Sequence, residues 1–518
     1  MDSTTEMLAS YAASIGYPDL TPEAVHQTKV RVLDSLGCAM GGYLSEPSMI
    51  ARRMAAMYSS TLPARVLGSG QVTSPEMAAF ANTVMVRFLD YNDSGAGHLS
   101  DMLSAVLTVA EPLHSTGREV ILAVVAAYEV GGAISDAIPF MRKGWDQGTF
   151  IVIGSAVGAG KILGLSREQM AQAISLAVTP NIPTRQTRAG ELSMWKGCAT
   201  ADAARKGIFA ALLAREGMTG PNEPFEGRHG VWEQVTGPFR LKPLGGDGRP
   251  FRVERTTLKY FPAEGNAQAP LGMALEIRKK VRLEDIEAIN VQTYWEAWSE
   301  IGSEPQKWDP QTRETADHSM PYLLAAALHD GNITPASFTP ERILDPGLRP
   351  LMNRIKVSEN PEFSRAYPGA RMTEIEVVTR SGERLVERAS YPKGDPRNPL
   401  SDEEVEAKFR RLCLEVLTLQ QCQAASETLW RLEDVPDIGR VIDLFQVQGN
   451  TSPAPASPLF SLPLPPTIWA TCPKGSPLRH AESRCRPRCS PRSLSGPVRC
   501  SRPGRGPSSW WKGGSCRR

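Results

Sequence analysis

The residues best suited to acid–base chemistry lie in one short run, residues 88–101, which reads FLDYNDSGAGHLSD. This run holds the carboxylates of Asp90, Asp93 and Asp101 and the imidazole of His98 within twelve residues. They lie in a glycine-containing loop that leads into an apolar segment. The ordinary pKa of histidine is near working pH, and a neighbouring carboxylate can orient or tune the ring. The run therefore predicts a general acid–base cluster in which Asp93 orients His98.

The same run also has a purely structural interpretation. Asp, Asn, Ser and Gly favour turns and helix caps because their side chains bond to nearby backbone groups. In that interpretation, Ser100 or Asp101 caps the helix that follows. Taken alone, the run favours the catalytic and the structural interpretation about equally.

Four cations further along the chain suit an anionic substrate. Arg185 and Arg188 belong to a TRQTR run, Lys196 lies before an Ala-rich segment, and Lys259 precedes YFPAE. Arginine offers paired hydrogen bonds to a carboxylate, and lysine offers a compact point charge. A single surface cation is usually only solvated, but together these residues predict binding of a di- or tricarboxylate.

Metal and phosphate chemistry are less well supported. The histidines form no HxxxH or HExxH pattern, and Asp90, Asp93 and His98 alone do not complete a ligand set for a divalent ion. Segment 154–162 (GSAVGAGKI) superficially suggests a Walker A loop, but Ser155 stands where Gly is required and Ile162 where Ser or Thr is required. Its small residues predict close helix packing instead.

Helical patterns dominate residues 1–255 and return in 401–446. Thr21 can cap a helix that Pro22 begins and that ends near residues 41–42. Ser166 and Ser401 each open a sequence typical of a capping box. We therefore expect a large all-helical domain over 1–255, completed by 401–446.

Residues 256–400 show a different pattern. Ile289, Val291 and Thr293 alternate with polar residues, as do Ile375 and Val377, and a turn at 380–383 precedes another apolar pair. Such alternation predicts strands and a hairpin. Helical patterns interrupt it at 321–329 and 340–355. The expected fold class is therefore a large helical domain with a second, smaller α+β domain over 256–400.

Charge is distributed unevenly along the 518 residues. The formal net charge is +2, which suggests neither a nucleic-acid binder nor a highly acidic chain. Residues 451–518 carry 12 Lys and Arg against one acid, a net charge of +11, so the first 450 residues carry −9. That segment also has 13 Pro and 12 Ser. Such a composition predicts a disordered basic tail over 447–518, or an artefact of the gene model, rather than a basic arm for anionic partners.

The N-terminal residues, MDSTTE, lack the basic and apolar regions of a secretory signal and are not Arg-rich. The longest apolar stretches fall short of the ~18 residues that a membrane span needs. Four cysteines are scattered through the first 450 residues without a CxxC pair. We therefore expect a cytoplasmic protein with no membrane or nucleic-acid partner.

Several separated motifs resemble the MmgE/PrpD family, which includes 2-methylcitrate dehydratase and cis-aconitate decarboxylase. Each motif is weak alone, but their order is specific, and the likeness covers about residues 5–447. The motifs are VLDSLGC (32–38), LDYNDS (89–94), HLSD (98–101), GWDQGT (144–149), KG (196–197), FPAE through AQ (261–268) and DHSMPY (317–322).

The resemblance implies an active site between the two domains, a homodimer, and no metal or organic cofactor. By motif match, the family's active-site positions correspond to Asp93, His98, Lys196 and Tyr322. The resemblance also implies that substrate is bound by Arg185, Arg188, Asp90, Gln147, Lys259, Gln268 and His318. In this scheme His98 transfers a proton, and Tyr322 donates a proton to the leaving oxygen.

Two departures from the dehydratase pattern affect the expected chemistry. Gln147 and Asn266 stand where dehydratase relatives usually have histidine, and amides cannot shuttle protons near neutral pH. Gly265 replaces an aromatic residue and would open space beside the substrate. These changes predict a bulkier substrate or an altered pocket.

The predicted function is therefore dehydration of 2-methylcitrate or a longer 2-alkylcitrate, a small tricarboxylate, as in secondary metabolism. Two alternatives remain open. One is a cis-aconitate decarboxylase, and the other is a non-catalytic relative that binds carboxylates.

Overall fold

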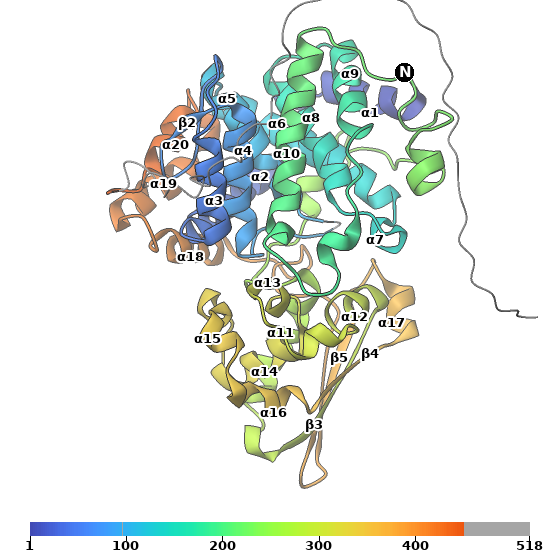
Figure 1. The fold of residues 1–518 in the computed structure, drawn as a ribbon, viewed down its shortest axis with the longest axis vertical. Coiled ribbons are helices and arrows are strands. Elements are labelled where there is room, and N and C mark those ends of the chain that lie inside the picture. Colours follow the sequence, from blue (N-terminus) through green and yellow to red (C-terminus); the bar gives the residue numbers. More distant parts are fainter. Residues whose placement is uncertain (96, 450–518) are drawn as a thin grey trace, which may run out of the picture. The chain divides into compact units, whose positions relative to one another are not determined.

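The computed structural model describes residues 1–95 and 97–449 of the chain (Figure 1). The described residues belong to one compact unit. Apart from residues 447–449, the predicted tail lies outside the described residues, so its order is not addressed.

Helices make up most of the first 215 described residues, together with a short hairpin of β1 (Ala64–Arg65) and β2 (Val72–Thr73). The helices are α1 (Ser3–Ser14), α2 (Pro22–Gly42), α3 (Glu46–Ala55), α4 (Pro75–Phe88), α5 (Leu103–Ala110), α6 (Gly117–Ala137), α7 (Phe140–Lys143), α8 (Gly148–Ile162), α9 (Arg167–Val178) and α10 (Trp195–Arg215). Three more helices close the described chain: α18 (Asp402–Cys413), α19 (Leu419–Trp430) and α20 (Gly439–Leu444).

The predicted helix starts are confirmed. Thr21 accepts a hydrogen bond from the backbone N–H of Ala24 at the start of α2. Ser166 and Ser401 each form a capping box, at the starts of α9 and α18. These side chains satisfy backbone donors that have no partner within the helix.

Helix α8 lies in the middle of the helical region and contacts α6 and α10. Glycines allow the close approach, since a Cβ on Gly154 would lie 2.8 Å from the carbonyl oxygen of Ala127 in α6. Likewise, a Cβ on Gly207 would lie 2.7 Å from the carbonyl oxygen of Val152. Segment 154–162 therefore serves helix packing, as its small residues predicted.

Within residues 1–95 and 97–449, one helix, α6 (Gly117–Ala137), is long and apolar enough to cross a membrane by length and composition. Most of it is buried against other helices. This burial is typical of a core helix in a water-soluble fold.

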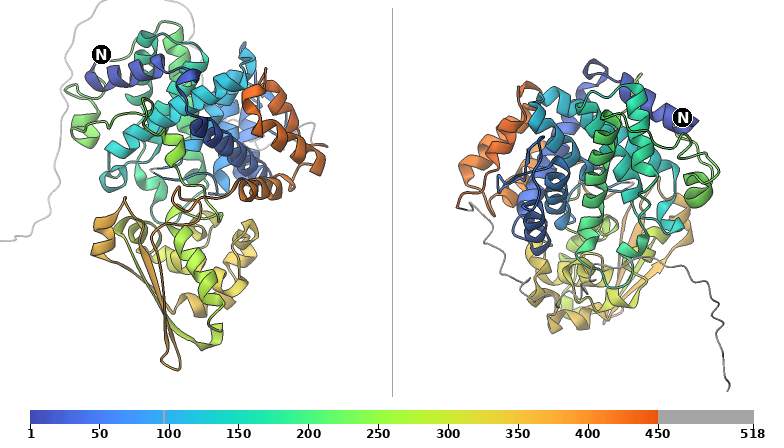
Figure 2. Two further views of the ribbon diagram at one scale, coloured as in Figure 1. Left: turned by 180° about the vertical axis from the view of Figure 1, so that it is seen from behind. Right: turned by 45° about the horizontal axis from the view of Figure 1, so that its top comes forward.

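The C-terminal helices α18 and α19 return to the helical region and pack against α2, as the view from behind shows (Figure 2). The approach is close, because a Cβ on Gly37 of α2 would lie 3.1 Å from the Cα of Phe409. Buried apolar residues of 8–258 and 405–445 accordingly form one core cluster.

A four-stranded sheet with covering helices occupies residues 261–389. Its order is β4-β3-β5-β6, with β3 parallel to β4 and antiparallel to β5. The strands are β3 (Ile286–Thr293), β4 (Ile355–Glu359), β5 (Thr373–Thr379) and β6 (Arg384–Ala389). The helices are α11 (Gln268–Arg278), α12 (Trp295–Ile301), α13 (Arg313–Ala316), α14 (Met320–Asp330), α15 (Pro340–Ile343), α16 (Arg349–Met352) and α17 (Pro361–Ala366).

Apolar residues alternate with polar ones along the strands, and the apolar side chains form the second core. Val291 pairs with Val357 on one side and Ile375 on the other, and all three side chains are buried. These strands and α11 and α14 share a second apolar cluster. The fold class is thus as predicted, while the domain boundaries at 255/256 and 400/401 stay predictions.

Segment 340–355 is helical, as predicted, but in short pieces. These are the one-turn helices α15 and α16 and the 3₁₀ turn η11 (Pro346–Leu348), and β4 begins at Ile355. Pro346 lies between the two helices and, lacking a backbone N–H, cannot continue a helix.

Candidate active site

A cavity of about 830 Å³ is lined by residues of both regions. This volume lies within the range of about 300–1,000 Å³ that is typical of small-molecule sites. The loop 94–98 and the ends of α6 and α8 form one wall, and residues of η7 (Gly265–Ala267), α12 and the segment before β5 form another.

The loop that carries His98 is fixed by an unusual backbone conformation and by cross-chain bonds. Asp90 has a φ of 49°, in the left-handed region that non-glycine residues seldom adopt. The backbones of Ser94 and Thr257 exchange two hydrogen bonds of 2.7 Å. Such conformations persist where the surroundings over-determine them, which is common at functional sites.

His98 lines the cavity, and its ring is held by a hydrogen bond at Nδ1. Nδ1 lies 2.6 Å from the backbone carbonyl oxygen of Asp93, and Nε2 lies 3.7 Å from Oδ1 of Asp90. Its backbone N–H donates to Oε1 of Gln147 at 3.1 Å. A bond from Nδ1–H to the carbonyl leaves Nε2 unprotonated in the neutral ring.

Desolvation by burial, with the nearby charges of Arg87 and Lys259, holds the pKa of His98 well below its usual value. The imidazole is therefore neutral at neutral pH and available as a base.

The carboxylate of Asp93 contacts other groups than the His98 ring. Its Oδ1 accepts from the backbone N–H (3.0 Å) and the hydroxyl (2.6 Å) of Ser100, and its Oδ2 accepts from the hydroxyl of Tyr128. Asp93 thus orients His98 through its backbone carbonyl, whereas its side chain braces the loop.

The alternative prediction, that Ser100 or Asp101 caps the following helix, is wrong. No side chain caps α5, and Met102 occupies its N-cap position. Ser100 bonds to Asp93, and Asp101 Oδ1 accepts from the amide of Asn92 at 2.8 Å.

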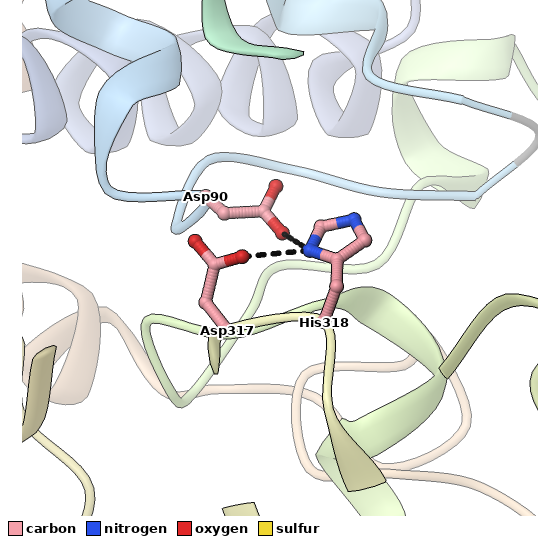
Figure 3. Close-up of side chains that lie close together, drawn as sticks. All are labelled: Asp90, Asp317 and His318. Atoms are coloured by element: carbon pink, nitrogen blue, oxygen red, sulfur yellow. Dashed lines mark hydrogen bonds and ion pairs between the residues drawn. The ribbon is translucent and has the colours of Figure 1, made fainter. Parts of the chain in front are cut away.

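A buried charge cluster lies beside the cavity, consisting of Asp90, Asp317, His318, Lys196 and Lys259. Lys196 Nζ lies 2.7 Å from Asp317 Oδ1, and Lys259 Nζ lies 3.0 Å from Asp90 Oδ1. Figure 3 shows Asp90 and Asp317 converging on Nδ1 of His318, at 3.8 Å and 2.7 Å.

Charge pairing sets the protonation of this cluster. Burial alone would raise the pKa of Asp90, but Arg87 and Lys259 hold it well below its usual value. Desolvation and the Lys196 ammonium lower the pKa of His318 to about 4. His318 lines the cavity as a neutral ring whose Nδ1 is bound to Asp317.

The same cluster is the one group of described residues that could present three metal ligands, from Asp90, Asp317 and His318. Its carboxylates, however, already face the ammonium groups of Lys196 and Lys259. A metal ion would have to enter against these positive charges, so the carboxylates suit the two ammonium groups better than they suit a metal ion.

The predicted cations fall into two groups. Arg185 and Arg188 line the cavity, paired with Glu300 at 2.9 Å and Asp146 at 2.7 Å. Nη2 of Arg188 is buried and has no hydrogen-bond partner among the described residues. An unsatisfied buried donor is costly, and a ligand carboxylate would satisfy it.

Lys196 and Lys259, by contrast, are bound within the charge cluster and are absent from the described cavity lining. Two further predicted residues are also engaged elsewhere. Tyr322 donates its hydroxyl hydrogen to the carbonyl of Ser337 inside the second apolar core. Gln268 bonds to backbone groups of Tyr260 and Phe261 and so shapes their loop. The role of Tyr322 as donor to the leaving oxygen therefore has no geometric support.

Sequence reasoning missed Glu264 as a site residue, although its motif was recognised. Its carboxyl lines the cavity, and its oxygens accept from the backbone and the amide of Asn266. Desolvation and the neighbouring carboxylate of Glu300 raise the pKa of Glu264 to about 8. At neutral pH it is mostly a protonated acid facing the cavity.

Gly265 and Asn266, which depart from the dehydratase pattern, line the cavity next to Glu264. Asn266 bonds to Glu264 and accepts from the hydroxyl of Tyr294 at 2.5 Å. A Cβ on Gly265 would lie 3.2 Å from Oγ of Ser94, so a large side chain there would have to extend into the cavity or displace Ser94.

Family comparison matches most of the chain. The MmgE/PrpD N-terminal domain matches residues 6–244, and the MmgE/PrpD C-terminal domain matches residues 261–434. Similar curated proteins include a human cis-aconitate decarboxylase, 26% identical over 483 residues, which cover 88% of this chain and 97% of the human protein. An alkylcitrate dehydratase from a fungal species is 28% identical over 433 residues (74% and 82% of the two chains). A 2-methylcitrate dehydratase of Cupriavidus necator is 28% identical over 459 residues (80% and 92%).

Proposed function

The chain belongs to the MmgE/PrpD family, and from that premise we propose that it is a hydro-lyase that removes water from 2-methylcitrate or a longer 2-alkylcitrate. Relatives named as dehydratases of both substrates support this proposal at modest identity. The carrying observation is that the neutral imidazole of His98 faces a cavity in which a buried guanidinium, that of Arg188, has an unsatisfied donor.

The proposed reaction is a proton abstraction followed by loss of the hydroxyl group as water. Nε2 of His98 takes the proton alpha to a substrate carboxylate, and the electron pair of the broken C–H bond moves onto that carboxylate; it forms the alkene when the carbon–oxygen bond breaks. Because a carboxylate is a poor activator, Arg188 stabilises the negative charge that develops on its oxygens, while Arg185 helps to bind the substrate. The carbon–oxygen bond breaks, and the hydroxyl leaves as water with a proton from Glu264. The proton on His98 then returns to solvent or to Glu264.

Glu264 and His98 suit these opposite tasks because burial pushes their pKa values in opposite directions. A carboxyl whose pKa is about 8 is an acid at neutral pH, and an imidazole whose pKa is lowered is a base. His318, whose ring is oriented by Asp317, also lines the cavity and contributes a contact to the substrate.

An apolar part of the cavity supports a substrate with an alkyl chain. Ile138, Phe140 and Phe150 line the cavity, and Gly265 lines it without a side chain. A longer alkyl group would bury apolar area there at roughly 25 cal/mol per Å². Such a substrate is typical of secondary metabolism, to which we assign the enzyme; we further propose a cytoplasmic homodimer.

Incubation of the purified protein with 2-methylcitrate and a series of longer 2-alkylcitrates tests the substrate proposal. We expect kcat/KM to rise with chain length until the apolar part of the cavity is filled. A clear preference for the methyl compound would reject the longer-chain substrate, while leaving the dehydratase proposal in place.

A decarboxylase is the second candidate, favoured by the human cis-aconitate decarboxylase that is similar over nearly its whole length. Released carbon dioxide would identify this activity, whereas an alkene tricarboxylate identifies a dehydratase. A non-catalytic relative, motivated by Gln147 and Asn266, would show ligand-induced thermal stabilisation without turnover.

A further inference from the structure

Guanidinium groups dominate the charged lining of the cavity, and one of them differs from the others. Eight arginines line the cavity, and seven of them lie within ion-pair distance of a carboxylate. Arg397, for example, pairs with Asp395 at 2.7 Å. Among the described residues, Arg371 has no such carboxylate.

The single hydrogen bond that the side chain of Arg371 makes among the described residues connects it to the loop of His98. Its Nη2 donates to the backbone carbonyl oxygen of Gly95 at 2.8 Å. The remaining N–H donors of its guanidinium have no hydrogen-bond partner among the described residues. Arg371 lies just before β5 and is half-buried, so the bond to Gly95 holds its charge at the cavity, close to the loop that carries the proposed base.

Charge complementarity indicates what the free donors would bind. A half-buried guanidinium with no carboxylate within ion-pair distance favours an anion, and its fork of N–H groups matches a carboxylate in two parallel bonds. Arg188, which also has a free donor, comes from η4 (Arg185–Arg188), a different element of the chain. The two guanidinium groups are therefore suited to hold different carboxylates of one ligand.

We infer that Arg371 binds one carboxylate of the substrate and selects tricarboxylates over dicarboxylates. This inference takes its substrate class, a tricarboxylate, from the proposed function. It does not depend on the proposed chemical step. In this proposal Arg371 takes the carboxylate on the middle carbon of the substrate, which a dicarboxylate of the same chain length lacks, so the dicarboxylate would bind more weakly.

Calorimetric titration with two unreactive ligands tests this role. Tricarballylate carries three carboxylates, and glutarate carries two on a chain of the same length. We expect the wild-type protein to bind tricarballylate more tightly, and Arg371→Gln to weaken tricarballylate about 10- to 100-fold while changing glutarate much less. Arg371→Lys, which keeps the charge but not the fork, should give an intermediate loss and guards against a folding defect in Arg371→Gln.

Arg388→Gln is the matched control, because Arg388 is an exposed β6 residue that pairs with Glu374 away from the cavity lining. It should bind both ligands as the wild type does. Equal weakening of both ligands by Arg371→Gln, or no preference in the wild type, would overturn the inference. Turnover of 2-alkylcitrates is measured separately. Arg371-dependent binding without turnover would reject only the proposed reaction, and turnover without Arg371 dependence would reject only this inference.

Discussion

The buried charge cluster and the arginine-lined cavity wall use charge in different ways. In the cluster, the carboxylates of Asp90 and Asp317 are each paired with an ammonium group within 3.0 Å, so their negative charge is already compensated inside the protein. On the wall, Arg188 and Arg371 keep donors that no described residue satisfies. The cluster therefore positions the site while the wall binds substrate, and His98 lies beside Asp90 of the cluster and lines the cavity.

Replacing His98, which lies beside the charge cluster and lines the cavity, should have the largest effect on activity. His98→Ala should lower kcat by about two to four orders of magnitude, the usual contribution of one general acid or base. Steady-state turnover of a 2-alkylcitrate measures it. His114→Ala, at an exposed histidine that pairs with Asp437, is the control. Near-normal turnover of His98→Ala would remove His98 from the mechanism.

Breaking the cluster should appear first in stability. Lys196→Met leaves the Asp317 carboxylate buried with less compensation, so the free energy of unfolding should fall by about 3 kcal/mol. Denaturant titration measures this loss. Lys206→Met on the same helix, where Lys206 pairs with partly exposed Asp202, should cost less than about 1 kcal/mol. Equal losses in the two variants would mean that the cluster is no more important to the fold than a surface pair.

The pH dependence of the reaction tests the proposed acid on the wall. Glu264 must be protonated to act, so kcat should fall as pH rises through about 8, the raised pKa of this carboxyl. The lowered pKa values of His98 and His318 keep both rings neutral across this range. Glu264→Gln should lower kcat by about 100-fold and abolish this alkaline limb. Glu276→Gln, an exposed carboxylate paired with Lys279, should retain it. An unchanged limb in Glu264→Gln would assign the titration to another group.

The smallest effect is expected at a wall arginine that already has a partner. Arg185→Gln removes one of several cations, so KM should rise about 10-fold with little change in kcat or in melting temperature. Arg205→Gln, outside the described cavity lining, serves as the control. A loss in kcat as large as that of His98→Ala would contradict a purely binding role for Arg185.

Local patterns in the sequence were sufficient to predict the helix starts, the hairpin of β5 and β6, and the loop of His98. They depend on residues a few positions apart, as with Ser166 and its capping box. The parallel pairing of β3 with β4 was not predicted, because a long helical connection separates the two strands. Parallel partners are distant in sequence and carry no turn signal.

The site residues show the same difference between local patterns and long-range contacts. The motif order identified Asp90, His98 and His318, which the structure brings together. Which of the cations face the cavity could not be predicted, because Lys196 and Lys259 find partners 121 and 169 residues away along the chain. Arg371 lies outside every recognised motif, and only its tertiary contact with Gly95 places it at the site.

Mass-spectrometric analysis of the products formed by the wild-type protein and by His98→Ala from one 2-alkylcitrate tests the central claim most directly. We predict that the wild-type product has lost one water and kept all three carboxylates, and that His98→Ala forms it at least a hundredfold more slowly. Loss of carbon dioxide, or equal product from both proteins, would contradict dehydration by the imidazole of His98.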